Sequence, residues 1–96
     1  MAKKDEEIRD EREHAWLGDA VLALFARQWV LAECKTMDGQ WFTRLTSNDF
    51  LSAFGNPTAV EAGIGRLYRE QGLAAAFAWI EETLIPVFRK QMAKRV

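Results

Sequence analysis

Cysteine and histidine are almost absent from this 96-residue chain, which has one of each, Cys34 and His14. A single cysteine excludes an intrachain disulfide and fits a reducing compartment, so we expect a cytoplasmic protein. The same scarcity excludes a zinc site built from cysteine and histidine within one chain. Any bound metal ion should therefore be a hard cation held by carboxylates.

Long apolar runs and an excess of one charge are also missing. No hydrophobic stretch approaches the ~20 residues that span a bilayer. Met1 leads into charged residues rather than into the apolar segment of a signal peptide. We therefore expect no membrane association. Thirteen basic and fourteen acidic residues give a net charge of −1, which disfavours a histone-like nucleic-acid binder and leaves a local basic face open.

The hydrophobic share of 49% is enough for one core, and the chain is too short for two domains of ordinary size. We divide it into a charged N-terminal segment, residues 1–13, and a single helical domain, residues 14–96. The mixed charges of the first segment indicate an exposed helical face or a frayed terminus. Apolar residues at helical spacing, few β-branched residues and no hairpin signal predict an all-α fold of four to five helices.

Turn and capping residues predict the boundaries in the first half of the chain. A helix should cover residues 14–33 and end near Cys34–Thr36, before an Asp-Gly turn at residues 38–39. Residues 40–46 should form a short helix or turn. Ser47 should then cap a further short helix.

Proline and glycine predict the boundaries in the second half. Asn56 as a cap and Pro57 at the first position should begin a helix that Gly72 ends. The last helix should span roughly residues 73–92, with a kink or interruption at Pro86. Its inward-facing residues are expected to be Leu73, Phe77, Ile80, Leu84, Val87 and Phe88.

Two carboxylates, Asp19 and Glu61, lie in apolar surroundings rich in alanine and glycine. Burying an unpaired carboxylate is costly, so each should be paired, bound to a cation or open to solvent at a groove. Nearby glycines at positions 18, 63 and 65 each cost about 1 kcal/mol in a helix interior. A glycine tolerated there usually lets another backbone come close.

These residues predict that two helices cross tightly, with Asp19 and Glu61 facing each other. Such a pair would raise one pKa unless a divalent ion such as Mg²⁺, with several waters retained, lies between the carboxylates. Other readings remain open. Asp19 could pair with Arg66 or Arg69 or face solvent, and Glu61 lies in the early turns of its helix, where the macrodipole favours negative charge.

Residues 17–22 read LGDAVL and residues 59–68 read AVEAGIGRLY. These two segments resemble the acidic helices of the ribonuclease III family, and residues 71–76 are similar to the turn into that family's last helix. The resemblance covers about residues 14–88, in order. It is closest to the compact Mini-III ribonucleases and implies a ribonuclease III-like helical fold without a separate double-stranded-RNA-binding domain.

The sequence departs from the family pattern at several places. The standard family uses four acids, two of which would fall at Ala15 and Thr58, although Mini-III members tend to have alanine and threonine there as well. Only Gly55 and Asn56 join two helices where Mini-III members carry a longer basic segment. Asp49 matches a position that is often acidic in the family, and it is equally suited to support a helix N-terminus.

The resemblance implies Mg²⁺- or Mn²⁺-dependent hydrolysis of phosphodiesters in double-stranded or structured RNA, of the type used in ribosomal RNA maturation. Asp19 and Glu61 would bind the metal ion, Asp49 is a further candidate ligand, and Thr58 would hold a water molecule. The ion would polarise the phosphate and stabilise the leaving oxygen, and the RNA would be recognised by its shape. The alternatives are a weak or inactive homodimer that binds RNA or a ribonucleoprotein without cutting, and a plain helical dimerisation module.

The resemblance also implies a homodimer. Trp16 matches a family aromatic that enters a socket on the partner subunit, and its alternative place is in the protein's own core. Arg44, Arg66 and Arg69 are candidate RNA contacts, with an ordinary solvated role as the alternative. Further candidates for phosphate contact are Arg89, Lys90, Lys94 and Arg95.

Overall fold

The computed structural model describes residues 4–94, and all regular structure within them is helical. The elements are α1 (Asp5–Cys34), α2 (Gly39–Leu45), α3 (Asn48–Leu51), the 3-10 turn η1 (Ser52–Phe54), α4 (Pro57–Gln71), α5 (Leu73–Thr83) and α6 (Ile85–Ala93). Four helices of the described chain, α1, α4, α5 and α6, span 30, 15, 11 and 9 residues. The predicted all-α class is confirmed.

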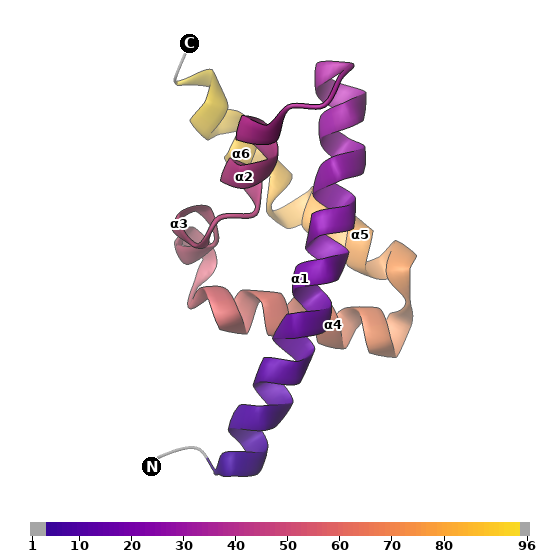
Figure 1. Ribbon diagram of the computed structural model, residues 1–96, viewed down its shortest axis with the longest axis vertical. Coiled ribbons are helices and arrows are strands. Elements are labelled where there is room, and N and C mark those ends of the chain that lie inside the picture. The colour runs from indigo at the N-terminus through magenta and orange to yellow at the C-terminus, as the bar shows by residue number, and fades with distance from the viewer. Residues whose placement is uncertain (1–3, 95–96) are drawn as a thin grey trace.

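Helix α1 is longer than the sequence predicts, because it begins at Asp5 rather than near residue 14. The charged residues that follow Lys4 are exposed and form its first turns, with three acids where the positive end of the helix dipole favours them. In Figure 1 this end of α1 projects beyond α4, which crosses the middle of α1. The charged segment is thus an exposed helical face where the structure describes it; Met1–Lys3 lie outside the described residues.

Side-chain caps begin the three helices that follow α1. The Asp38 carboxylate accepts a hydrogen bond from Trp41 N at 3.0 Å, and Ser47 Oγ accepts one from Phe50 N at 3.0 Å. At the start of α4, Asn56 Oδ1 accepts a hydrogen bond from Ala59 N at 3.2 Å, and Pro57 occupies the first turn. The predicted caps at Ser47 and Asn56 are confirmed.

Glycine and proline divide the C-terminal half as predicted. Gly72 ends α4 with a φ of 96°, a left-handed conformation that glycine adopts without strain. Pro86, which has no N–H to donate, lies in the first turn of α6, so the predicted last helix is two helices. One expected core residue is misplaced: Leu73 is exposed because it begins α5 at the edge of the core.

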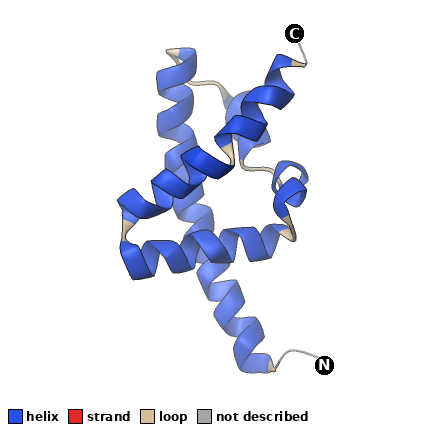
Figure 2. Ribbon diagram, turned by 180° about the vertical axis from the view of Figure 1, so that it is seen from behind, coloured by secondary structure: helices blue, strands red, loops and turns tan. Residues whose placement is uncertain are grey.

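The core gathers buried residues from the C-terminal half of α1 and from α2, α3, α4, α5 and α6. An aromatic cluster centres on Phe88, whose ring is 5.5–5.6 Å from the rings of Trp29, Trp41 and Phe50. Figure 2 shows α5 and α6 running on one side of α1 above α4. Nearer its N-terminus, α1 packs against α4, and this helix pair forms the candidate site.

Candidate functional site

Helices α1 and α4 meet backbone against backbone at two glycines, and we call this contact the α1–α4 crossing. A Cβ atom on Gly18 would lie 1.7 Å from the Glu61 carbonyl oxygen, and one on Gly65 would lie 1.9 Å from the His14 carbonyl oxygen. Neither distance is compatible with a side chain. Gly63, which we expected at the same contact, is exposed and has open space around it.

Close approach of the two backbones brings the carboxyl groups of Asp19 and Glu61 together. Asp19 is exposed and Glu61 is half-buried. Burial of Glu61, its hydrogen bond with Asp19 and the negative charge of Asp19 raise the pKa of Glu61 to about 7. The juxtaposition predicted from the spacing of acids and glycines is therefore present.

Two carboxyl groups in this arrangement share a proton or a cation, because two full negative charges at close range repel each other. Their oxygens are the hard ligands that Mg²⁺ and Mn²⁺ take in proteins. The alternative reading, in which Asp19 pairs with Arg66, is wrong because Arg66 binds another acid: its Nη2 donates to Asp10 Oδ2 at 3.0 Å.

On the other flank of the α1–α4 crossing, an acid meets a base. Hydrogen bonding and charge from Arg66, with further contributions from His14 and Arg69, hold the pKa of Asp10 below its usual value. The His14 ring Nδ1 lies 2.8 Å from the Asp10 carbonyl oxygen and 3.3 Å from its Oδ1. This cluster was not predicted from the sequence, although Asp10, His14 and Gly18 are spaced four residues apart on one face of α1.

The remaining predicted metal-site residues do not complete a larger ligand set. No group of three His, Cys, Asp or Glu side chains within residues 4–94 is placed to hold a metal ion. Asp49 is exposed at the start of α3 and does not join the Asp19–Glu61 pair. Thr58 is exposed in the first turn of α4, three residues before Glu61, which places both on the same side of that helix.

Two predicted RNA contacts already have protein partners. Arg66 lies in a hollow whose other lining residues are acidic, namely Glu6, Glu7, Asp10 and Glu11. Arg89 pairs with Glu33, with 3.3 Å between its Nη2 and Oε2, and stacks on the Trp29 ring with its guanidinium carbon 5.3 Å from the ring centroid. Lys90 of α6 is exposed, as are Lys94, which directly follows that helix, and Arg69; Arg95 lies outside the described residues.

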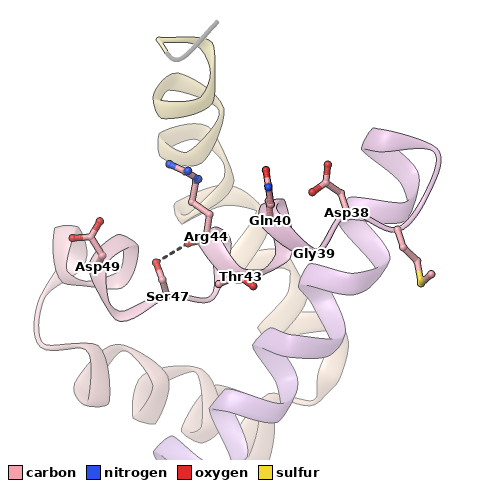
Figure 3. A pocket seen from close by; sticks show the side chains of 8 residues that line it. Asp38, Gly39, Gln40, Thr43, Arg44, Ser47 and Asp49 are labelled. Atoms are coloured by element: carbon pink, nitrogen blue, oxygen red, sulfur yellow. Dashed lines mark hydrogen bonds between the residues drawn. The ribbon is translucent and has the colours of Figure 1, made fainter.

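Arg44 lies in a wide, open hollow of about 1050 Å³ over α2 and α3. Figure 3 shows its side chain extending to the same side as those of Asp38 and Asp49, and Ser47 Oγ donates a hydrogen bond to the Arg44 carbonyl oxygen at 2.8 Å. One arginine between two aspartates does not make a positive surface. The hollow therefore offers a phosphate no net attraction.

Trp16 is 78% exposed, so the reading that placed it in the protein's own core is wrong. Ala15, its neighbour at a usually acidic family position, is buried. An exposed tryptophan of this kind is typical of an interface, since aromatic residues are enriched there.

Comparison with known proteins adds no relative to this picture. No protein-family model, curated protein or solved structure matches the chain. Helix α1 is long and apolar enough, over an 18-residue window, to meet a length-and-composition criterion for a membrane span. The core helix of a soluble protein meets the same criterion, and one face of α1 is buried in this core.

Proposed function

We propose that this protein is a Mg²⁺-dependent endoribonuclease that hydrolyses phosphodiesters in double-stranded or structured RNA, in the manner of a Mini-III ribonuclease. The observation that supports the proposal is the carboxyl pair of Asp19 and Glu61 at the α1–α4 crossing. Each of the two sequence segments that resemble the acidic helices of the ribonuclease III family contributes one carboxyl group to this pair. We further propose that the enzyme is a cytoplasmic homodimer.

The carboxyl pair fits a divalent cation chemically. A cation at the pair would replace the shared proton and remove the repulsion that raises the pKa of Glu61. Two protein carboxylates are enough for Mg²⁺, which usually keeps several waters and binds one or two carboxylates together with substrate phosphates. The ion would supply Lewis-acid chemistry at the scissile phosphodiester.

The chain's own residues have separate parts in this proposal. Asp19 is exposed, so a phosphodiester can approach the pair from solvent. Glu61 is half-buried and holds a proton below about pH 7 in the absence of a cation. The hydroxyl of Thr58, an exposed residue on the same side of α4, would hold a water molecule near Glu61. Since metal binding requires ionised carboxylates, activity should rise with pH through this range.

The second candidate is a homodimer that binds RNA or a ribonucleoprotein without cutting it. It is favoured by the small ligand set, because no third acid joins Asp19 and Glu61 among the described residues. Arg66 and Arg89, which would contact phosphates, also have acidic partners within the chain.

The test is incubation of the protein with a double-stranded RNA and Mg²⁺ or Mn²⁺, comparing wild type with Asp19→Asn. We expect cleavage that Asp19→Asn reduces by more than the roughly 10–100-fold that loss of an outer-sphere partner costs a metal site. Asp10→Asn is the matched control: it is the same substitution on the same helix, at an acid paired with Arg66. RNA binding without cleavage in wild type would support the second candidate, and equal cleavage by Asp19→Asn would contradict the proposed metal site.

A further inference from the structure

Gly63 has no part in the α1–α4 crossing. It lies two residues after Glu61 and two before Gly65, which turns it about 200° from each around the axis of α4. It is exposed, and a Cβ atom there would meet nothing within 4 Å. Because glycine destabilises a helix interior relative to alanine, the side of α4 that faces away from α1 carries an unfavourable residue that no packing within residues 4–94 explains.

A hollow of about 400 Å³ lies between α4 and α5, and Gly63 is part of its lining. Figure 2, which views the molecule from the side opposite α1, shows these two helices diverging from the turn that joins them. The volume falls within the ~300–1,000 Å³ of small-molecule pockets, which are mostly apolar with a few polar groups. This hollow has the same character: its apolar walls are the partly buried Phe54, Val60, Leu67 and Trp79, and its polar side chains are Asn56 and Thr83.

The α4 side of the hollow suits a flat molecule. Ala59, Gly63 and Leu67 are four residues apart and form one row along the helix, so the centre of the row has no side chain. A planar ring can lie there directly against the helix backbone, which is the kind of close approach that glycine allows. With a rise of ~1.5 Å per residue, Ala59 and Leu67 are about 12 Å apart along α4, which leaves room for two fused rings between them.

Trp79 forms the wall on the α5 side and has no aromatic or hydrogen-bonding partner within residues 4–94. Its side chain is half-buried, yet its ring stacks on no other ring and its indole N–H meets no protein acceptor. Trp29 and Trp41, in contrast, stack on each other with 5.8 Å between their ring centroids. A half-buried tryptophan usually places its ring against an apolar group and its N–H against an acceptor. A ligand in the hollow can supply both.

The charge of the hollow selects a neutral ligand. All the residues that line it are uncharged. Glu81 and Glu82 are exposed and directly precede Thr83 at the end of α5. A phosphate or carboxylate would therefore find no cation in the hollow and two negative charges beside it, which disfavours the RNA backbone as the occupant.

We propose that the hollow between α4 and α5 binds a small, neutral, planar aromatic molecule with a hydrogen-bond acceptor at its edge. The ring lies on the α4 backbone at Gly63 and against the indole of Trp79, whose N–H donates to the acceptor. A heteroaromatic molecule of two fused rings has the expected size. Because Glu61 lies on the other side of α4, this site does not depend on the proposed nuclease activity.

The test is a titration of the full chain with quinoline at neutral pH, without metal or RNA, followed by ¹H–¹⁵N NMR. Quinoline has two fused rings, an acceptor nitrogen at its edge and no charge at this pH. We expect saturable shifts of the Gly63 amide and the Trp79 indole N–H, with a dissociation constant in the millimolar range. Shifts that do not saturate, or that spare both of these resonances, would overturn the proposal.

Gly63→Leu tests the location of the site by filling the hollow. It should weaken quinoline binding at least about 10-fold without unfolding the protein, since a side chain at this position begins in open space. Ala74→Leu is the matched control, because Ala74 is an exposed residue of α5 outside the hollow, and it should bind as wild type does. Circular dichroism verifies that both variants are folded. Unchanged binding by Gly63→Leu, or an equal loss in Ala74→Leu, would contradict the site.

Trp79→Phe tests the hydrogen bond while retaining an aromatic ring. Naphthalene has the shape of quinoline without its acceptor, so the substitution should weaken quinoline binding about 3–10-fold more than naphthalene binding. Equal losses for the two molecules would refute the assigned donor.

Oligouridine, a single-stranded RNA without stable structure, distinguishes a free ligand from a nucleobase of RNA. It should leave the Gly63 and Trp79 resonances unshifted, because the hollow offers its phosphates no cation. Shifts of both resonances by oligouridine would show that the hollow takes an unstacked base of RNA and would overturn the small neutral ligand.

Discussion

The two flanks of the α1–α4 crossing place a carboxylate against opposite kinds of neighbour. On one flank Asp10 meets the guanidinium of Arg66, and the pKa of Asp10 is lowered. On the other flank Glu61 meets the carboxyl group of Asp19, and burial together with this acid raises the pKa of Glu61 to about 7. The charge of Asp10 is balanced by Arg66, whereas the Asp19–Glu61 pair holds a proton or attracts a cation.

Both flanks depend on the same backbone contact. Because Gly18 and Gly65 have no side chains, the two helices approach until the backbone of each touches the other. Polar groups that flank such a contact are held close whatever their sign. The residue type at each position then decides whether the result is an ion pair or a candidate cation site.

The largest expected effect comes from separating the helices. Gly65→Ala places a Cβ 1.9 Å from the His14 carbonyl oxygen, so the helices must move apart and both flanks are lost. We expect the free energy of unfolding to fall by about 3 kcal/mol, at the upper end for overpacking of a core. Chemical denaturation measures it.

Gly63→Ala is the matched control for this substitution, in the same helix two residues away. A Cβ on Gly63 meets nothing within 4 Å, so the better helix propensity of alanine should stabilise the protein by up to about 1 kcal/mol. Equal destabilisation by both substitutions would contradict the close approach as the cause, because only Gly65 lies against the backbone of α1.

The next effect is a pH dependence on the acidic flank. The pKa of Glu61 is about 7 in the folded protein against an ordinary 4.5, so the folded state binds a proton that the unfolded state releases in this interval. Its stabilising contribution is complete below the ordinary value and is lost as the pH rises through about 7. Without divalent ions, wild type should therefore lose stability between about pH 5 and pH 8, by roughly 1 kcal/mol once solvent screening is allowed for.

Glu61→Gln should remove this loss and exceed wild type in stability at about pH 8, because glutamine carries no charge to repel Asp19. Thermal unfolding of both proteins at several pH values measures the difference. A wild type that gains stability over the same interval would contradict the assigned direction of the shift.

The smallest effect is expected on the ion-paired flank. Asp10→Asn removes the carboxylate that Arg66 contacts, and both side chains are exposed, so stability near neutral pH should hardly change and the difference should vanish in high salt. Because the pKa of Asp10 is lowered, its contribution is present above the ordinary value and is lost as the pH falls through the lowered one. Unfolding at low and high salt measures both points. A large loss from Asp10→Asn would show that the ion pair holds the crossing together.

Local signals in the sequence predict much of the architecture. Ser47, Asn56 and Pro57 begin helices because their side chains or fixed φ suit a first turn, and Pro86 ends one because it cannot donate a hydrogen bond. Asp19 and Glu61 could be paired because their glycine-rich surroundings suggested a close helix contact. The sequence did not predict that the charged segment forms the first turns of α1, because mixed charges are equally common in frayed termini.

Local sequence is enough to specify the all-helical class, most helix ends and the pair of acids beside glycines, since these depend on the backbone preferences of neighbouring residues. Packing specifies which glycines touch, that Arg66 turns to Asp10 rather than Asp19, and that Trp16 lies outside the core. Those outcomes depend on the rotation of α1 against α4, which is set by packing between residues about 40–50 positions apart in the chain. No local pattern encodes that angle.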